Sequence, residues 1–186
     1  MRVQNAKLKM NRREIMGYSQ YIDHTCLKPT ALVSDIENLC REAIKNKFFS
    51  VCVNPYYVKL AKEILRDTSV SVCAVVGFPL GQNTLETKLF ETAQCLSNGA
   101  DEIDYVVNIS TILENDFEYI KKEAESIKNM CVNRTIKAII EIAYLNDQQI
   151  LNACDALILG GADFVKTSTG FAPSGDRKST RLNSSH

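Results

Sequence analysis

The sequence contains no tryptophan and only two histidines, His24 and His186. A serine triad or a histidine-rich metal site would have to be built on His24, because His186 lies in a polar C-terminal segment. A single histidine at the end of a strand is more often a structural side chain than a catalyst. The sequence therefore supports neither kind of site, and we expect no metal and no cofactor.

Other absences narrow the class of protein further. No two of the seven cysteines stand at CxxC spacing, and scattered cysteines in odd number are typical of reduced thiols in a cytosolic protein. Lysines plus arginines equal aspartates plus glutamates at 22 each, so no basic surplus indicates nucleic-acid binding. The apolar runs are far shorter than the roughly 20 residues of a membrane helix. Residues 1–13 are basic but lack the apolar centre of a signal peptide. We expect a cytoplasmic protein without a nucleic-acid or membrane partner.

The chain divides into two segments of different character. Residues 1–175 alternate apolar runs with amphipathic segments, and their composition suits one globular domain. Residues 176–186 show no periodicity, contain Leu182 as their only apolar side chain, and resemble one reading frame of a common sequencing-adapter oligonucleotide. We interpret residues 176–186 as a non-native polar tail and expect the natural chain to continue differently. The alternative is a genuine polar C-terminus.

The apolar runs and the amphipathic segments predict an alternation of strands and helices. Short runs rich in β-branched residues predict strands at 21–23, 50–53, 71–77, 102–107, 136–141 and 163–167. Helical spacing predicts helices at 35–46, 56–66, 84–97, 117–130 and 147–159. In the third helix, Leu85, Leu89, Ala93 and Leu96 are predicted to form one apolar face. Predicted N-caps are Ser34 or Asp35, Asn83 or Thr84, and Asn146 or Asp147.

Strict alternation of strand and helix predicts a parallel sheet, either doubly wound or closed into a barrel. No strand is followed by GxGxxG, which argues against a dinucleotide-binding fold. Polar residues instead follow strand after strand, at the end where a barrel keeps its active site; they are Asp23, Asn54, Asn108, Glu141 and Lys166. We therefore predict a TIM (β/α)₈ barrel that is incomplete, with about six of its eight βα units.

Lys166 is the strongest candidate for chemistry. It ends an apolar strand, where a barrel interior would desolvate its ammonium and lower its pKa. A neutral amine can attack a carbonyl and form a Schiff base. Thr169 and Gly170, which follow, offer a hydroxyl and a permissive backbone for a small polar ligand. The alternative is a lysine that extends to solvent from a strand end.

Asp104 is the second candidate, because it places an acid inside an apolar strand. Buried aspartates are rare unless paired, so Lys137 or Lys166 is expected beside it. A carboxylate next to an amine can carry protons during carbinolamine formation and collapse. A purely structural ion pair is the alternative for Asp104, and more strongly so for Asp23 and Lys137.

Six segments, in order and at compatible spacing, resemble bacterial deoxyribose-phosphate aldolases. They are YIDHTCLKPT at 21–30, SVCVNP at 50–55, VVGFPLG at 75–81, GADEIDYVVN at 99–108, KAIIE at 137–141 and GADFVKTSTGF at 161–171. The resemblance implies a metal-free aldolase that reversibly cleaves 2-deoxy-D-ribose 5-phosphate to acetaldehyde and D-glyceraldehyde 3-phosphate. It implies that Lys166 forms the Schiff base and that Asp104 relays protons. It also implies that Asp23, Cys52 and Lys137 line the pocket, and that the full-length protein is a homodimer.

The chain departs from the resembled family in three respects. The family's second lysine on the seventh strand and its phosphate-binding loops after strands seven and eight would lie beyond Gly175. Ile142 and Ala143 stand where the family commonly has a small polar residue. We therefore expect the chain as given to be a poorly active or inactive fragment. Rival interpretations are another Schiff-base barrel aldolase, an inert fragment of aldolase ancestry, and a phosphate-binding module without covalent chemistry.

Overall fold

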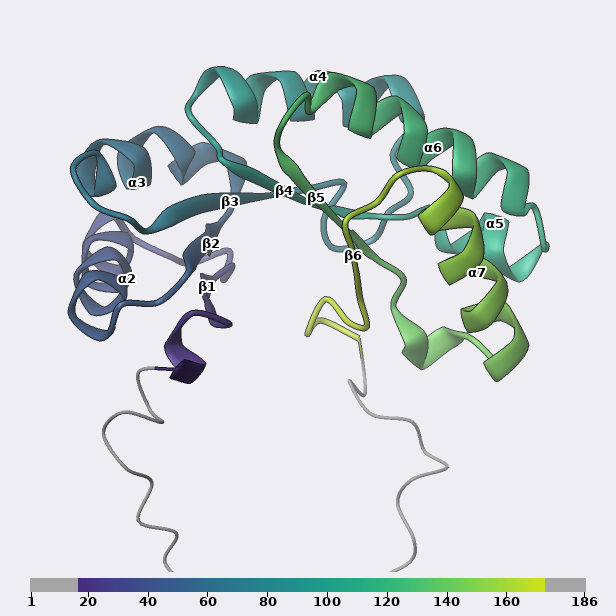
Figure 1. The fold of residues 1–186 in the computed structure, drawn as a ribbon, viewed down its shortest axis with the longest axis horizontal. Helices are drawn as coiled ribbons and strands as arrows, with labels where there is room; N and C mark the ends of the chain where they lie inside the picture. The colour runs from purple at the N-terminus through teal and green to yellow at the C-terminus, as the bar shows by residue number, and fades with distance from the viewer. Residues whose placement is uncertain (1–16, 173–186) are drawn as a thin grey trace, which may run out of the picture.

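Each of the strands β1 to β5 is followed by a helical segment, and this alternation gives the molecule its architecture (Figure 1). The computed structural model describes residues 17–172. The strands are β1 (Asp23–Cys26), β2 (Ser50–Val53), β3 (Ser71–Val76), β4 (Glu102–Val106), β5 (Thr135–Ile139) and β6 (Phe164–Lys166). The helices are α2 (Val33–Asn46), α3 (Val58–Leu65), α4 (Leu85–Ser97), α5 (Ile109–Leu113), α6 (Phe117–Met130) and α7 (Asp147–Leu159).

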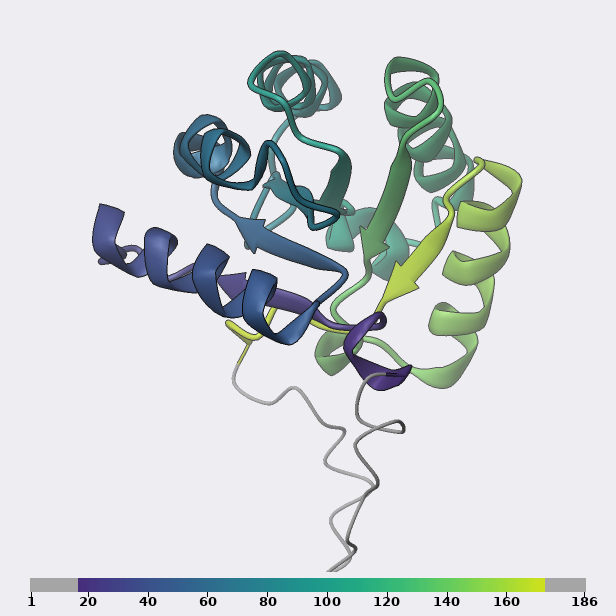
Figure 2. The ribbon, with the colours of Figure 1, turned by 60° about the vertical axis from the view of Figure 1, so that its left-hand side comes forward.

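The six strands form one parallel sheet in chain order, β1 to β6. The sheet is strongly curved and the helices cover its outer face, so the described residues form an incomplete barrel (Figure 2). The predicted fold class and the predicted number of strands are confirmed. Within residues 17–172, no helix combines the length and the apolar character that crossing a membrane requires.

Side chains alternate between the two faces of each strand and form two apolar clusters. Val51, Val72 and Ile103 belong to the large cluster beneath the helices, whereas Cys52 and Cys73 belong to a small cluster inside the barrel. All residues of β2 and β4 are buried, as expected for a parallel sheet with both faces covered. The inner face is where the strands can present polar side chains to one another.

Helix α4 is rotated relative to the face its leucines predict, although Leu89 and Leu96 still pack against the large cluster. The buried residues are Lys88, Thr92 and Cys95, whereas Ala93 of the predicted apolar face is exposed. Lys88 explains the shift, because its ammonium is buried and donates to Glu123 Oε1 of α6 at 2.6 Å and to the Val106 carbonyl at 2.8 Å. A buried ion pair, which apolar periodicity does not reveal, sets the orientation of this helix.

We expect Lys88→Met to lower the free energy of unfolding by about 3–5 kcal/mol, because it leaves the Glu123 carboxylate buried without its countercharge. Burial already raises the pKa of Glu123 above its ordinary value despite Lys88. Urea unfolding measures the effect. Lys121→Met is the control, since the Lys121–Glu125 pair is half-exposed and 3.8 Å long. A loss below 1 kcal/mol for Lys88→Met would show that the pair does not hold the helices together.

The repeated Gly-Ala-Asp segments lead each time from a helix into a strand, as predicted. Gly99 takes φ +99°, a left-handed conformation that glycine adopts without strain. The carboxylate of Asp101 then accepts the backbone N–H of Val72 at 2.9 Å and the Lys62 ammonium at 2.7 Å. Asp163 accepts the N–H of Ile136 at 2.8 Å in the same way. The repeat therefore ties each new strand to the preceding one.

Several predicted boundaries are wrong for local reasons. The first strand begins at Asp23 and not at Tyr21, because Tyr21 and Ile22 donate backbone N–H groups to a preceding turn. The predicted helix 56–66 is a 3₁₀ turn followed by α3, and the strand predicted to end at Glu141 ends at Ile139. Helix α5 was not predicted, because five residues are too few to show a period.

The helix N-termini agree with the predictions in two cases of three. The side chains of Thr84 and Asn146 accept backbone N–H groups and cap α4 and α7. Helix α2 begins earlier than predicted and is capped at Leu32, whose N–H donates to the Asp35 carboxylate at 2.8 Å. Asp35 therefore serves as the third helical residue and not as the cap.

Candidate active site

The polar side chains of the barrel interior come from neighbouring strands held in fixed register. Asp104 of β4 lies opposite Lys137 of β5, and Ile139 of β5 lies opposite Lys166 of β6. Residues two apart on a strand point to the same face, so Lys137, Ile139 and Lys166 share the interior. Asp23 of β1 completes the group across the barrel. Segments more than a hundred residues apart thus meet in one site.

Lys166 and Lys137 are both paired with carboxylates. Lys166 Nζ lies 2.5 Å from Asp104 Oδ2 and 3.6 Å from Asp23 Oδ2. Lys137 Nζ lies 3.4 Å from Asp104 Oδ1, 2.9 Å from Asp23 Oδ2 and 2.7 Å from Glu102 Oε2. The predicted pairing of Asp104 with Lys137 or Lys166 is confirmed, and both lysines take part. Three carboxylates thus share two ammonium groups inside the barrel.

These contacts change the protonation behaviour of the lysines. Burial lowers the pKa of Lys166, but the charge and the hydrogen bond of Asp104 outweigh it and raise that pKa above its ordinary value. The pKa of Lys137 is raised in the same way, because the surrounding anionic groups outweigh burial. The expected lowering of the pKa of Lys166 is therefore wrong. The sequence suggested desolvation but could not show the distance to the carboxylate.

Asp23 has the opposite shift. Burial raises its pKa, but hydrogen bonds from Ser50 and Lys137 outweigh burial, so the pKa is lowered from its ordinary value. The Ser50 hydroxyl donates to Asp23 Oδ1 at 2.7 Å. Asp23 is therefore a stable carboxylate that holds Lys137 in position.

A cavity of about 480 Å³ borders the two lysines, and most of its lining lies at the amino-terminal ends of the strands. Its wall combines the charged groups Asp23, Glu102, Lys137 and Lys166 with apolar surface from Tyr21, Phe49, Phe164 and Val165. Lys166 keeps 32% of its side chain exposed, whereas Lys137 keeps 8%. Lys166 is therefore the amine that a small ligand can reach.

The thiols of Cys52 and Cys73 lie beside the charged group. The two residues are directly opposite each other on β2 and β3, and Lys137 Nζ is 3.9 Å from Cys73 Sγ. Burial raises the pKa of Cys73 well above its ordinary value. Of these two cysteines, the sequence resemblance identified only Cys52 as a pocket residue. Cys73 was not predicted, although its alternation with Val72 and Ala74 on β3 indicates that it faces inward.

Glu141 organises the loop that follows Lys166. Its carboxylate accepts the backbone N–H of Thr169 at 3.0 Å and also the Thr169 hydroxyl. Glu141 itself is 2% exposed and holds a positive φ of +47°, which is strained for a residue with a side chain. The predicted pocket residue Thr169 thus bonds Glu141, and Gly170 follows with φ +84°. The strand-end position of Glu141 was visible in the sequence, but its partner was not.

We expect Glu141→Ala to speed hydrogen exchange at the Thr169 amide by roughly tenfold or more, because this part-buried N–H loses a hydrogen bond to a charged group, worth about 1.5–3 kcal/mol. Glu141→Gln is the matched variant, since its carbonyl oxygen still accepts from Thr169 while the charge is gone. In Glu141→Gln, hydrogen exchange at the Thr169 amide should therefore be close to the wild-type rate. Unchanged exchange in Glu141→Ala would show that other contacts hold the loop.

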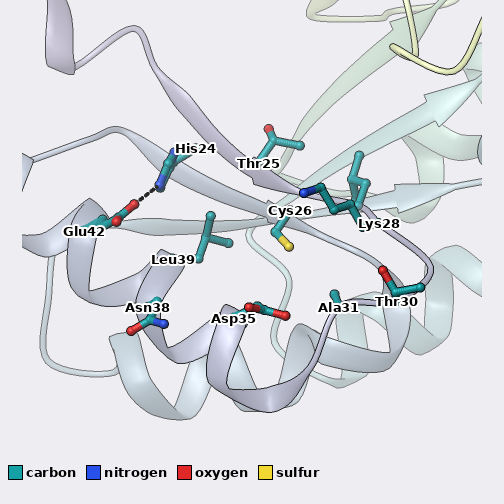
Figure 3. A pocket seen from close by; sticks show the side chains of 11 residues that line it. His24, Thr25, Cys26, Lys28, Thr30, Ala31, Asp35, Asn38, Leu39 and Glu42 are labelled. Carbon is teal, nitrogen blue, oxygen red and sulfur yellow. Dashed lines mark hydrogen bonds and ion pairs between the residues drawn. The ribbon is translucent and has the colours of Figure 1, made fainter.

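His24 lies outside this group, as a structural histidine would. Its ring nitrogen Nε2 is 2.8 Å from Glu42 Oε2, and the pair borders a second cavity of about 400 Å³ between β1 and α2 (Figure 3). Asp35 and Asn38 of α2 also face this cavity. The histidine stabilises the contact of α2 with the sheet and is not part of the lysine site.

Comparisons with known proteins agree on one family. Residues 18–185 match the family described as DeoC/LacD family aldolase. A deoxyribose-phosphate aldolase of Ureaplasma parvum serovar 3 is 49% identical over 158 residues, which cover 85% of this chain and 74% of that protein.

Solved structures give the same picture. A candidate deoxyribose-phosphate aldolase from Coccidioides immitis superposes with a TM-score of 0.83 at 35% identity, covering 85% of this chain and 62% of that one. A tetrameric deoxyribose phosphate aldolase from Aeropyrum pernix superposes with a TM-score of 0.74 at 31% identity, covering 87% and 73%. The chain thus spans less than two thirds of the Coccidioides immitis protein and about three quarters of the other two.

Proposed function

The chain belongs to the DeoC/LacD aldolase family, and on that premise we propose that it is a Schiff-base aldolase acting on 2-deoxy-D-ribose 5-phosphate. Its products are acetaldehyde and D-glyceraldehyde 3-phosphate, and the reaction is reversible. The observation that carries the proposal is the 2.5 Å contact between Asp104 Oδ2 and Nζ of Lys166, which lines the 480 Å³ cavity. It places an amine that a ligand can reach against a buried carboxylate that can take its proton.

The raised pKa of Lys166 means that its resting state is an ammonium bonded to a carboxylate. In the proposed reaction Asp104 accepts one proton from Lys166 as the aldehyde approaches, and the free amine attacks the carbonyl carbon. Asp104 then returns that proton to the alkoxide, which gives a carbinolamine whose nitrogen still carries the positive charge. Loss of the hydroxyl together with one proton of that nitrogen, as water, leaves the protonated imine. One carboxylate therefore serves both transfers without a metal.

Carbon–carbon bond formation uses the imine as an electron sink. A methyl proton of the bound acetaldehyde unit leaves, and the electron pair forms an enamine. The enamine carbon attacks the aldehyde carbon of D-glyceraldehyde 3-phosphate, whose oxygen takes up a proton. Hydrolysis of the new imine frees Lys166 and the sugar phosphate. Cleavage runs through the same steps in reverse order.

Lys137 and Asp23 have positioning roles in this proposal. Lys137 is held by Asp23 and Glu102, and its ammonium stands 3.4 Å from Asp104 Oδ1. The positive charge of Lys137 opposes the ammonium of Lys166 and favours its loss of a proton. Cys52, Thr169 and Gly170 are proposed as neighbours of the substrate at the pocket wall.

Imine trapping tests the proposal directly. The full chain is incubated with acetaldehyde and borohydride, and added ethyl groups are located by peptide mass spectrometry. We expect a single ethyl group on Lys166, formed faster than on exposed lysines such as Lys59. Labelling that is spread evenly over surface lysines in a cooperatively folded chain would refute the proposal. Cleavage of deoxyribose 5-phosphate, compared with fructose 1,6-bisphosphate, identifies the substrate.

We also propose that the protein is a cytoplasmic homo-oligomer, with a dimer as the smallest assembly. All seven cysteines are free, which suits a reducing compartment. The Aeropyrum pernix relative is tetrameric, which supports self-association. Light scattering after gel filtration tests the assembly, and a monomer at micromolar concentration would contradict it.

A further inference from the structure

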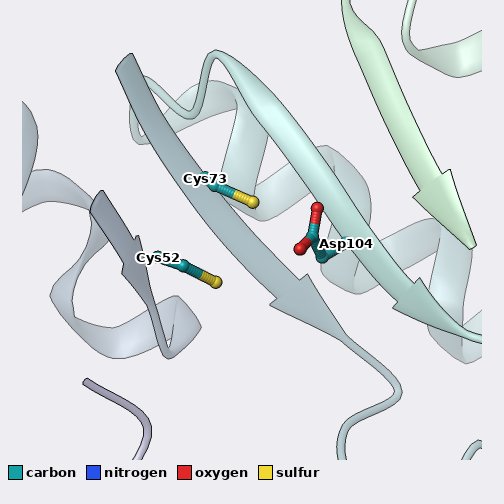
Figure 4. A group of neighbouring side chains, drawn as sticks. All are labelled: Cys52, Cys73 and Asp104. Atoms are coloured by element: carbon teal, nitrogen blue, oxygen red, sulfur yellow. The ribbon is translucent and has the colours of Figure 1, made fainter. Parts of the chain in front are cut away.

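Two thiols and one carboxylate face one another inside the barrel, on three successive strands. Cys52 comes from β2, Cys73 from β3 and Asp104 from β4, and Figure 4 shows their side chains on the same side of the sheet. The two Sγ atoms and a carboxylate oxygen all lie within 4.8 Å of one another. Such a group has the composition of a metal site, since thiolates and a carboxylate are ligands that zinc and cadmium accept.

A second observation comes from Asp104 itself. Asp104 is fully buried, and its Oδ1 atom accepts no hydrogen bond from the described residues, although the Lys137 ammonium stands 3.4 Å away. Its other oxygen, Oδ2, is bonded to Lys166. Buried carboxylate oxygens are usually satisfied, so Oδ1 is available for a further partner.

We propose that Cys52, Cys73 and Asp104 form a binding site for a thiophilic divalent cation, Zn²⁺ or Cd²⁺, and that its occupation opposes Schiff-base formation at Lys166. On coordination, each thiol releases one proton to solvent, and the two thiolates with Asp104 Oδ1 supply three ligands. The fourth position of a tetrahedral ion is left to water. The binding part of this inference is independent of the proposed aldolase activity, whereas the inhibitory part rests on it.

The geometry requires only a small adjustment. With zinc–sulfur bonds of about 2.3 Å, tetrahedral coordination separates two sulfur atoms by about 3.8 Å. The two sulfur atoms lie at most 4.8 Å apart, so they would have to approach each other by no more than about 1 Å, which rotation of the cysteine side chains can supply. The nearby cations are Lys137 and Lys166, and the nearby anions are Asp23, Glu102 and Asp104. Adding a divalent cation and two thiolates leaves that local charge unchanged.

Occupation of the site changes the environment of Lys166. The ion and its water would lie against the carboxylate that Lys166 Nζ contacts at 2.5 Å, so they would occupy the space that an aldehyde must enter to reach the amine. The cavity next to this group is the one lined by Lys137, whose Nζ is 3.9 Å from Cys73 Sγ. The site therefore connects exposure to thiophilic metals with loss of Schiff-base chemistry.

Titration of the full chain with Cd²⁺, in a buffer with a non-thiol reductant, tests the binding. We expect an ultraviolet thiolate-to-metal charge-transfer band that saturates at one Cd²⁺ per chain. Cys73→Ala and Cys52→Ser should lose the band, whereas Cys154→Ser should keep it because Cys154 lies on α7. Asp104→Asn should weaken binding at least about tenfold, since loss even of an outer-shell partner costs 10- to 100-fold. A cooperative thermal melt shows whether each variant is folded. If Cys73→Ala does not fold, the charge-transfer band of Cys52→Ser decides whether the site exists.

The absence of a band in the wild type, or an equal band in both cysteine variants, would overturn the site. The inhibitory part is tested by imine trapping: saturating Cd²⁺ should suppress the ethyl label on Lys166 in the wild type but not in Cys73→Ala. An undiminished label in the wild type would overturn the coupling. If Lys166 takes no label even without metal, the proposed aldolase activity fails, while the charge-transfer titration still decides the metal site.

Discussion

Lys166→Met is expected to abolish the borohydride-trapped ethyl adduct and to reduce any cleavage of deoxyribose 5-phosphate to the uncatalysed rate, a loss of up to roughly 10⁶-fold on the scale of other covalent enzymes. The physical reason is that the substitution removes the only atom of the side chain that can form an imine. Methionine keeps the length and much of the volume of lysine, so the pocket wall is retained. Peptide mass spectrometry after trapping and a coupled aldehyde assay measure the two effects.

Two comparisons keep this prediction specific. Lys59→Met removes an exposed lysine of α3 and should leave both the adduct and the turnover unchanged. Lys137→Met removes the other interior lysine, which is 8% exposed against 32% for Lys166, and should leave an adduct on Lys166 while lowering turnover. If the adduct moves to Lys137 in the Lys166→Met variant, the assignment of the nucleophile is wrong.

The fold was predictable because its elements have strong local signals. Helices α6 and α7 begin and end where their periodicity predicts, and β2 has its predicted bounds. Boundaries failed where a non-local or conformational feature decides them. The strand β5 ends before Glu141 because that residue adopts φ +47° to reach Thr169, and no local pattern encodes this contact.

The candidate site was predictable residue by residue but not in its electrostatics. A lysine and an aspartate within apolar strands stood out in the sequence, and the barrel topology brought them together. The contact of Lys166 with Asp104 spans 62 positions of the chain, and that of Lys137 with Asp23 spans 114. The sign of a pKa shift depends on such distances, because burial and a neighbouring carboxylate act on an ammonium in opposite directions. Sequence alone supplied only the first of these effects.

The charge arrangement assigns different tasks to the two lysines. Lys137 is enclosed by three carboxylates and has almost no contact with solvent, so it is suited to holding charge. Among the described residues, Lys166 forms ion pairs with Asp104 and Asp23, and its side chain stays partly accessible at the cavity wall. A site with two ammonium groups and two shared carboxylates can therefore keep one lysine fixed while the other exchanges protons with Asp104.

Asp104→Asn is expected to lower turnover of deoxyribose 5-phosphate by about 10²–10⁴-fold, the usual contribution of a positioned acid–base group. The amide keeps the shape of the side chain but cannot accept the proton that Lys166 must lose. The same change removes the main cause that raises the pKa of Lys166, so burial should then lower that pKa and leave more neutral amine. The final yield of trapped ethyl adduct on Lys166 should therefore persist while catalysis is lost.

This divergence separates the proton relay from a structural ion pair. If Asp104 only held Lys166 in place, Asp104→Asn would reduce labelling and turnover together, because a displaced amine is poorly placed for both. Asp23→Asn is the matched control, since Asp23 stands 3.6 Å from Lys166 and contacts it more weakly than Asp104 does. It should change turnover less than Asp104→Asn. If the Lys166 label survives in Asp104→Asn while turnover falls at least a hundredfold, Asp104 transfers the proton and Lys166 supplies the electron pair that forms the bond.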